Sequence, residues 1–145
     1  MSEQPPTPEY PAEVYARFLF YAEADLRAAE QVLQSSGGFW HVPCFLARES
    51  GEKSLKAFLE AAGKAAPDLH SLRTLCRECV AVDKEFGRFT KHGEILNRYQ
   101  SEARYPMSLD YPFTQEKATE VVRLARELFE FVRDKIERRK QAGLL

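Results

Sequence analysis

The sequence predicts an all-α protein, an antiparallel up-and-down bundle of four main helices plus a short helix. Apolar residues recur in steps of three and four along several long segments, and no segment alternates apolar and polar residues long enough to form a sheet. Short connections favour antiparallel neighbours. The 145 residues fit one domain. We expect a proline-rich leader at 1–11, the bundle at 12–140 and a tail at 141–145.

The leader contains prolines at positions 5, 6, 8 and 11, so it cannot donate a full set of helical hydrogen bonds. The first helix is then expected over residues 12–33, and Gly37-Gly38 should end it. Its predicted inner face consists of residues spaced by three and four: Tyr15, Phe18, Ala22, Leu26, Ala29 and Leu33.

The second helix is expected over residues 42–62, with Gly63 as its C-cap. Its apolar residues are Phe45, Leu46, Leu55, Phe58 and Leu59. Between them the same face passes through the charged residues Arg48, Glu49 and Glu52. This interruption marks the second helix as a candidate functional element.

The third helix should open at Pro67-Asp68 and break near Gly87 or Gly93. Its apolar stripe comprises Leu72, Leu75, Cys76, Cys79 and Val80. A further short helix holds Ile95, Leu96 and Tyr99. The following segment, 101–113, contains two prolines and is predicted to be a loop.

The last helix shows the clearest periodicity, and Thr114 is a suitable N-cap for it. The charged segment 137–140 is expected to fray. Apolar residues of this helix form one stripe: Ala118, Val121, Val122, Ala125, Leu128, Val132 and Ile136. The predicted core of the whole bundle comprises Phe18, Leu26, Leu55, Leu59, Leu72, Leu75, Cys76, Val121, Ala125, Leu128 and Val132.

The overall charge favours no particular partner. With 21 Lys and Arg against 22 Asp and Glu, the net charge is -1, which gives no bulk reason to bind nucleic acid or an anionic membrane. No apolar run reaches the roughly 18 residues of a membrane span, and the N-terminus lacks a secretory signal pattern. Three cysteines do not form a disulfide framework. We therefore expect a cytoplasmic protein.

Two segments are candidates for binding. On the second helix, Glu49 with Lys53 and Glu52 with Lys56 are i, i+4 pairs. They form either a satisfied structural cluster or part of a ligand site. In the proline-constrained loop, Arg104 beside Tyr105 could hold a phosphate while the tyrosine ring stacks on a base. Alternatively, this arginine caps a helix or pairs with a carboxylate.

The cysteine and histidine side chains indicate neither a metal site nor a catalytic site. Cys76 and Cys79 continue the apolar stripe of their helix, so they are expected to pack as small hydrophobic residues, and zinc would need further ligands. His70 and His92 have no adjacent serine or cysteine nucleophile. We predict no metal, no cofactor and no catalytic residue.

Several short motifs occur in a familiar order. A first helix carrying Tyr21-Ala22-Glu23-Ala24-Asp25-Leu26 is followed by Cys44-Phe45-Leu46-Ala47 leading into Glu52-Lys53-Ser54-Leu55. Gly63, Pro67, His70-Ser71-Leu72 and finally Tyr99 before Ala103-Arg104-Tyr105-Pro106 complete the series. Over about residues 12–137 this order resembles the HEPN (higher eukaryotes and prokaryotes nucleotide-binding) domains, specifically the small stand-alone prokaryotic kind.

The resemblance implies a helical bundle that forms a homodimer and is associated with a nucleotide, RNA or a minimal nucleotidyltransferase partner. Some HEPN members are metal-independent ribonucleases, often toxins, with an arginine and a later histidine separated by four to six intervening residues. Here no histidine follows Arg104, and Arg88 with His92 is one position too close. The leading hypothesis is therefore a binding module with Arg104, Tyr105, Lys53, Lys56 and Glu49 as nucleotide-binding candidates. The alternatives are an RNA-cleaving toxin with a degenerate site and a purely structural interaction protein.

Overall fold

The structure is a computed structural model that describes residues 3–35 and 37–145, and its regular elements over these residues are all helical. The all-α helical bundle is thereby confirmed. Its elements are α1 (Val14–Ser35), α2 (His41–Ala61), α3 (Leu72–Val82), the 3-10 helix η1 (Lys84–Phe89), α4 (Thr90–Asn97), α5 (Tyr99–Glu102) and α6 (Gln115–Gln141).

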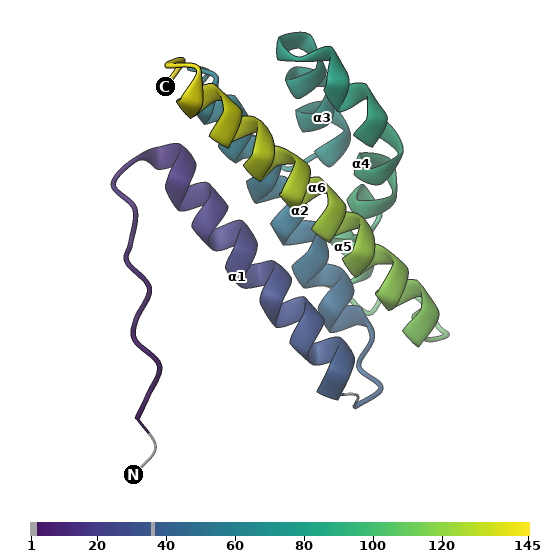
Figure 1. Ribbon diagram of the computed structural model, residues 1–145. Coiled ribbons are helices and arrows are strands. Elements are labelled where there is room, and N and C mark those ends of the chain that lie inside the picture. Colours follow the sequence, from purple (N-terminus) through teal and green to yellow (C-terminus); the bar gives the residue numbers. More distant parts are fainter. Residues whose placement is uncertain (1–2, 36) are drawn as a thin grey trace.

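Helix α2 is the centre of the bundle. It packs against α1 and α6, which lie alongside it, and against α3 and α4 on its other side (Figure 1). The chain reverses direction between α1 and α2, as the short connection predicts (Figure 1). Because α2 is covered on several sides, even charged side chains such as Arg48 and Glu52 on it are buried.

The ends of two helices follow from local sequence. Thr114 caps α6 as predicted, since its hydroxyl oxygen accepts a hydrogen bond from the Lys117 backbone N–H at 3.1 Å. Gly63 terminates α2 with φ of 82°, and the backbone N–H groups of Gly63 and Lys64 donate to Glu60 and Leu59. This bond pattern is the Schellman motif, in which glycine accepts the left-handed conformation without strain.

Helix α3 begins and ends elsewhere than the sequence suggests. It does not open at Pro67-Asp68 but at Leu72, where the Ser71 hydroxyl caps the Thr74 N–H at 3.3 Å. It ends at Val82, before either glycine of the predicted break. Gly93 instead lies buried inside α4, where an added Cβ would meet the Leu72 carbonyl oxygen at 3.4 Å. Three short helical pieces therefore occupy residues 84–102, where one was expected.

The predicted core is buried with one exception. Phe18 is only half-buried, because it lines a surface groove together with Tyr10 and Tyr21. The predicted fraying of 137–140 is also wrong, since α6 continues to Gln141 and ends at Gly143 with the same motif as α2. The other predicted core residues are all buried: Leu26, Leu55, Leu59, Leu72, Leu75, Cys76, Val121, Ala125, Leu128 and Val132.

Candidate functional site

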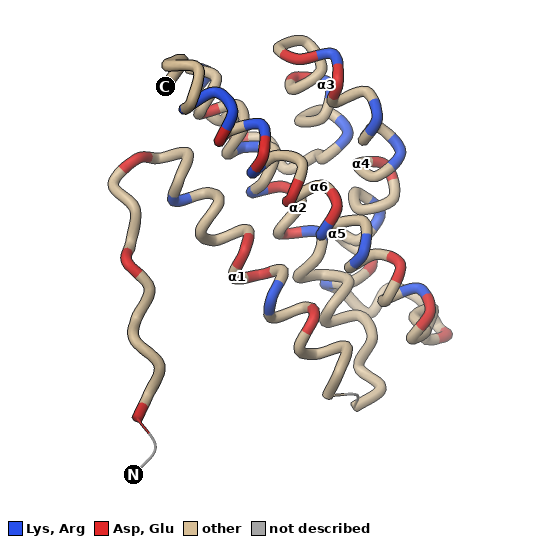
Figure 2. Tube along the Cα trace, viewed as in Figure 1, with Lys and Arg blue, Asp and Glu red and all other residues tan. Residues whose placement is uncertain are grey.

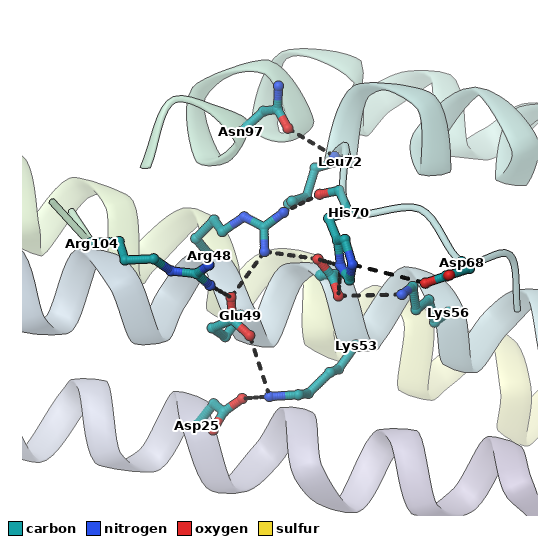
Figure 3. A network of polar contacts seen from close by, with 11 residues as sticks. Asp25, Arg48, Glu49, Lys53, Lys56, Asp68, His70, Leu72, Asn97 and Arg104 are labelled. Carbon is teal, nitrogen blue, oxygen red and sulfur yellow. Dashed lines mark hydrogen bonds and ion pairs between the residues drawn. The ribbon is translucent and has the colours of Figure 1, made fainter. Parts of the chain in front are cut away.

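A buried charged network surrounds Arg48 in the middle of α2 (Figure 3). Its Nη1 lies 2.8 Å from Glu52 Oε1 and 2.9 Å from Glu49 Oε1. Its Nη2 donates a hydrogen bond to the backbone carbonyl of His70, in the connection before α3. Arg48 is 1% exposed and Glu52 is 6% exposed, so each requires the other as a partner.

Two lysines complete this network, and they face different carboxylates. Lys53 pairs with Asp25 on α1 and lies 3.7 Å from Glu49 Oε2. Lys56 lies 3.3 Å from Glu52 Oε2. Both predicted i, i+4 pairs are thus present, and Lys53 additionally ties α2 to α1 (Figure 3).

The charges of the network keep Glu52 ionised. Burial alone would raise the pKa of this carboxyl, but attraction to Arg48 and Lys56 together with hydrogen bonds from Arg48 and His70 lowers the pKa below its usual value. The His70 ring contributes through Nδ1, which lies 3.3 Å from the Glu52 oxygens. A stable negative charge is therefore held inside the bundle.

Arg104 reaches the edge of the same network from the loop after α5. Its Nη2 lies 3.8 Å from Glu49 Oε1 (Figure 3). Its guanidinium carbon lies 5.4 Å from the centre of the Phe45 ring. The side chain remains 44% exposed, unlike that of Arg48. Arg104 therefore has a carboxylate partner, as the structural alternative expects, and also an open side that a ligand could reach.

Arg104 also lines a cavity of about 540 Å³ formed by the loop between α5 and α6. Its wall includes Arg104, the half-exposed Tyr105 and Tyr111, and His41 from the start of α2. The Tyr111 hydroxyl accepts a hydrogen bond from the His41 backbone N–H at 2.9 Å and lies 2.9 Å from Nδ1 of the ring. One cation and several aromatic rings thus share a single concave surface.

Not all predicted site residues meet in this cavity. Arg104 and Tyr105 line it, Glu49 touches Arg104, and Lys53 is connected through Glu49. Lys56 belongs to the opposite end of the network, beside Glu52 and His70. The sequence does not identify His41 and Tyr111, because no local motif indicates that residues so far apart along the chain share a wall.

The other reactive side chains lie away from this site. Cys76 and Cys79 are both buried in the core, and burial raises the pKa of each thiol. His92 contacts Glu127 on α6, with Nε2 2.7 Å from Oε2. Within the described residues, no group of three or more His, Cys, Asp or Glu side chains could hold a metal ion. None of the helices there is long and apolar enough to cross a membrane.

The fold and site define a small helical-bundle protein with an ionised polar network in its central helix. Residues 15–135 match the HEPN domain family, and the chain therefore belongs to that family. The crystal structure of TT1696 from Thermus thermophilus is similar with a TM-score of 0.70 and 26% identity, covering 83% of this chain and 97% of that one. ST0689, an archaeal HEPN homologue, has a TM-score of 0.67 and 23% identity, covering 84% and 97%. A search of curated protein sequences finds no match.

Proposed function

We propose that this HEPN protein is a homodimeric binding module that binds a nucleotide in the cavity formed by the α5–α6 loop. The observation that carries the proposal is the position of Arg104 beside Tyr105 on the wall of this cavity. A guanidinium presents donors in a planar fork that matches a phosphate, and a tyrosine ring offers a stacking surface for a base. The nucleotide is either free or held by a nucleotidyltransferase partner, as the family resemblance implies.

The contacts of Arg104 support this role because they orient the side chain and leave hydrogen-bond donors of its guanidinium available to a ligand. Glu49 lies on one side at 3.8 Å, which is longer than a direct hydrogen bond, and the Phe45 ring lies beneath the guanidinium. Glu49 is itself held by Arg48 and Lys53. A phosphate could therefore replace solvent on the exposed side of Arg104 while the network below remains paired.

The structural alternative attributes the same contacts to stability alone. In that case Arg104 serves to neutralise Glu49 and to cover Phe45, and the cavity has no ligand. The two functions differ in one measurable respect, because only a ligand site loses affinity without losing stability when Arg104 is truncated.

Calorimetric titration of the purified protein with ATP, GTP, CTP and UTP tests the proposal. For the nucleotide that binds, Arg104→Ala should weaken affinity by more than about 1.5 kcal/mol, or roughly tenfold, the lower end for a hydrogen bond to a charged group. Its melting temperature should stay close to that of the wild type. Arg133→Ala, at a half-exposed arginine of α6, is the matched control and should change neither quantity.

The opposite pattern would refute the nucleotide site. A lower melting temperature in Arg104→Ala, with no nucleotide bound by either protein, is the result that the structural alternative predicts. The Tyr105→Phe variant adds a second discriminator, because it retains the stacking ring and should bind as the wild type does, whereas Tyr105→Ala should bind more weakly.

A further inference from the structure

A groove on the outer side of α1 is lined by aromatic and cationic side chains. Val14, Phe18 and Tyr21 follow one another at helical spacing, and Val14 and Tyr21 are 44% and 51% exposed. The groove has a volume of about 270 Å³. We call this surface the α1 groove, and its lining residues are Tyr10, Val14, Arg17, Phe18, Tyr21 and Lys53.

The leader that precedes α1 is an exposed extended segment. Residues 3–10 are all exposed, and the segment turns back at the start of α1 and runs beside that helix, set apart from the bundle (Figure 1). Prolines at positions 5, 6 and 8 fix φ near -65° and favour the polyproline II conformation, so ordering this segment on a surface costs little entropy. At about 3.1 Å per residue, these eight residues reach roughly 25 Å.

Leader and groove are complementary in both shape and charge. Proline-rich segments in the polyproline II conformation bind grooves lined by aromatic rings, as the α1 groove is. The leader carries Glu3 and Glu9, whereas the groove carries Arg17 and Lys53. The coloured positions along the leader in Figure 2 are acidic. Lys53 already pairs with Asp25, so Arg17 is the cation expected to meet a leader carboxylate.

We propose that the leader of one copy docks in the α1 groove of a second copy, and that two copies exchange leaders about a two-fold axis. Tyr10 packs edge-on against Phe20 of its own helix, with ring centres 5.6 Å apart, which anchors the base of the leader. Residues 3–9 beyond this anchor are then free to extend onto the partner. This two-fold exchange forms a closed dimer, because each copy supplies one leader and one groove. The inference rests on the homodimer of the proposed function.

Sedimentation equilibrium of full-length variants tests the groove. Tyr21→Glu places an unpaired charge in the contact and should raise the dimer dissociation constant at least about tenfold. Leu69→Glu, at an exposed leucine of the α2–α3 connection, is the matched control and should dimerise as the wild type does. Arg17→Glu should also weaken the dimer, and adding Glu3→Lys and Glu9→Lys to it should restore much of the affinity.

Cross-linking tests whether the leader acts in the second copy or in its own. The double variant Thr7→Cys/Ala24→Cys places one thiol in the leader and one on the exposed side of α1. The native cysteines are buried and stay protonated, with the pKa of Cys44 raised to about 12, so a short bis-maleimide reagent should react at the introduced pair. We expect covalent dimers. Internally linked monomers would overturn the exchange.

The outcomes separate this inference from the function on which it depends. A full-length wild type that sediments as a monomer overturns both the homodimer and the exchanged leader. A dimer that Tyr21→Glu leaves unchanged overturns only the leader exchange. Nucleotide affinity is measured independently of both, because Tyr21 lies outside the wall of the α5–α6 loop cavity.

Discussion

The guanidinium of Arg48 lies 2.8 Å from the carboxylate of Glu52, one helical turn further along α2, and both side chains are almost fully buried. The desolvation penalty of such a pair can offset its attraction, so its presence is no measure of stability. The loss of one partner is different, because it leaves the other charge buried and unpaired. Arg48 also neutralises Glu49, so its removal affects two carboxylates.

The substitution Arg48→Met should therefore lower the free energy of unfolding by about 3–5 kcal/mol, the usual loss when a buried ion pair is broken from one side. Urea denaturation followed by circular dichroism measures this. The same substitution at Arg123, whose ion pair with Glu120 is exposed to solvent, is the control and should leave the free energy of unfolding nearly unchanged. Equal losses at the two positions would contradict the buried network.

The stability supplied by Glu52 should depend on pH. Its pKa is lower in the folded protein than the value of 4.5 for a free glutamate side chain, so the folded state binds this proton more weakly than the unfolded state. The contribution is fully present above pH 4.5 and is lost as the pH falls through the folded pKa. Wild type and Glu52→Gln should thus differ most in unfolding free energy near neutral pH, and the difference should shrink in acid.

Urea titrations of both proteins between about pH 7 and pH 3 provide the test. Other carboxylates with lowered pKa values, such as Asp83 beside Lys135, titrate equally in the two proteins and cancel in the comparison. A difference that stays constant down to pH 3 would show that Glu52 does not contribute through its charge.

Local patterns in the sequence predict helix ends correctly at Thr114 and Gly63, but they do not predict where the third helix breaks. The Thr114 cap and the Gly63 stop are correct because each depends on hydrogen bonds within a few residues. The predicted break of the third helix near Gly87 or Gly93 is wrong, since that helix ends at Val82. The position of Gly93 inside a helix is recognisable only once its tertiary neighbour, the Leu72 backbone, is known. Likewise, the half-exposed position of Phe18 depends on which face of α1 the other helices leave open.

Some contacts of the candidate site could likewise be predicted from the sequence, and others could not. The Glu49–Lys53 and Glu52–Lys56 pairs could be predicted because one helix fixes their spacing. The contact between Arg104 and Glu49 joins residues distant in the sequence, and it depends on how the α5–α6 loop folds back towards α2. Asp25, which holds Lys53 from α1, could not be identified for the same reason.

Substitution of Leu128 by Ala should destabilise the fold strongly. This side chain is 1% exposed on the buried face of α6, near the buried Gly51 of α2. Truncation should lower the free energy of unfolding by about 2–5 kcal/mol through lost burial and the cavity left behind. Thermal or urea denaturation measures the loss. Leu144→Ala in the exposed tail is the control and should stay within about 0.5 kcal/mol of the wild type.

The purified protein should leave RNA intact. Ribonucleases of the HEPN family, as the resemblance implies, combine an arginine with a later histidine that is separated from it by four to six intervening residues. The residues at that spacing after Arg104 are Leu109, Asp110 and Tyr111, and none of them is histidine. Arg88 and His92 come closest to the pattern, but the Arg88 guanidinium lies over the Phe131 ring, and His92 contacts Glu127.

Incubation with a labelled single-stranded RNA, followed by gel electrophoresis over time, tests this expectation. Cleavage that disappears in both Arg88→Ala and His92→Ala would contradict it and would locate the reaction at the junction of η1 and α4. Cleavage that persists unchanged in both variants and in Arg104→Ala would identify a contaminating nuclease, because it would depend on none of the three side chains. The expected result, uncut RNA with wild type and variants alike, follows from the lack of a histidine at the required distance from Arg104.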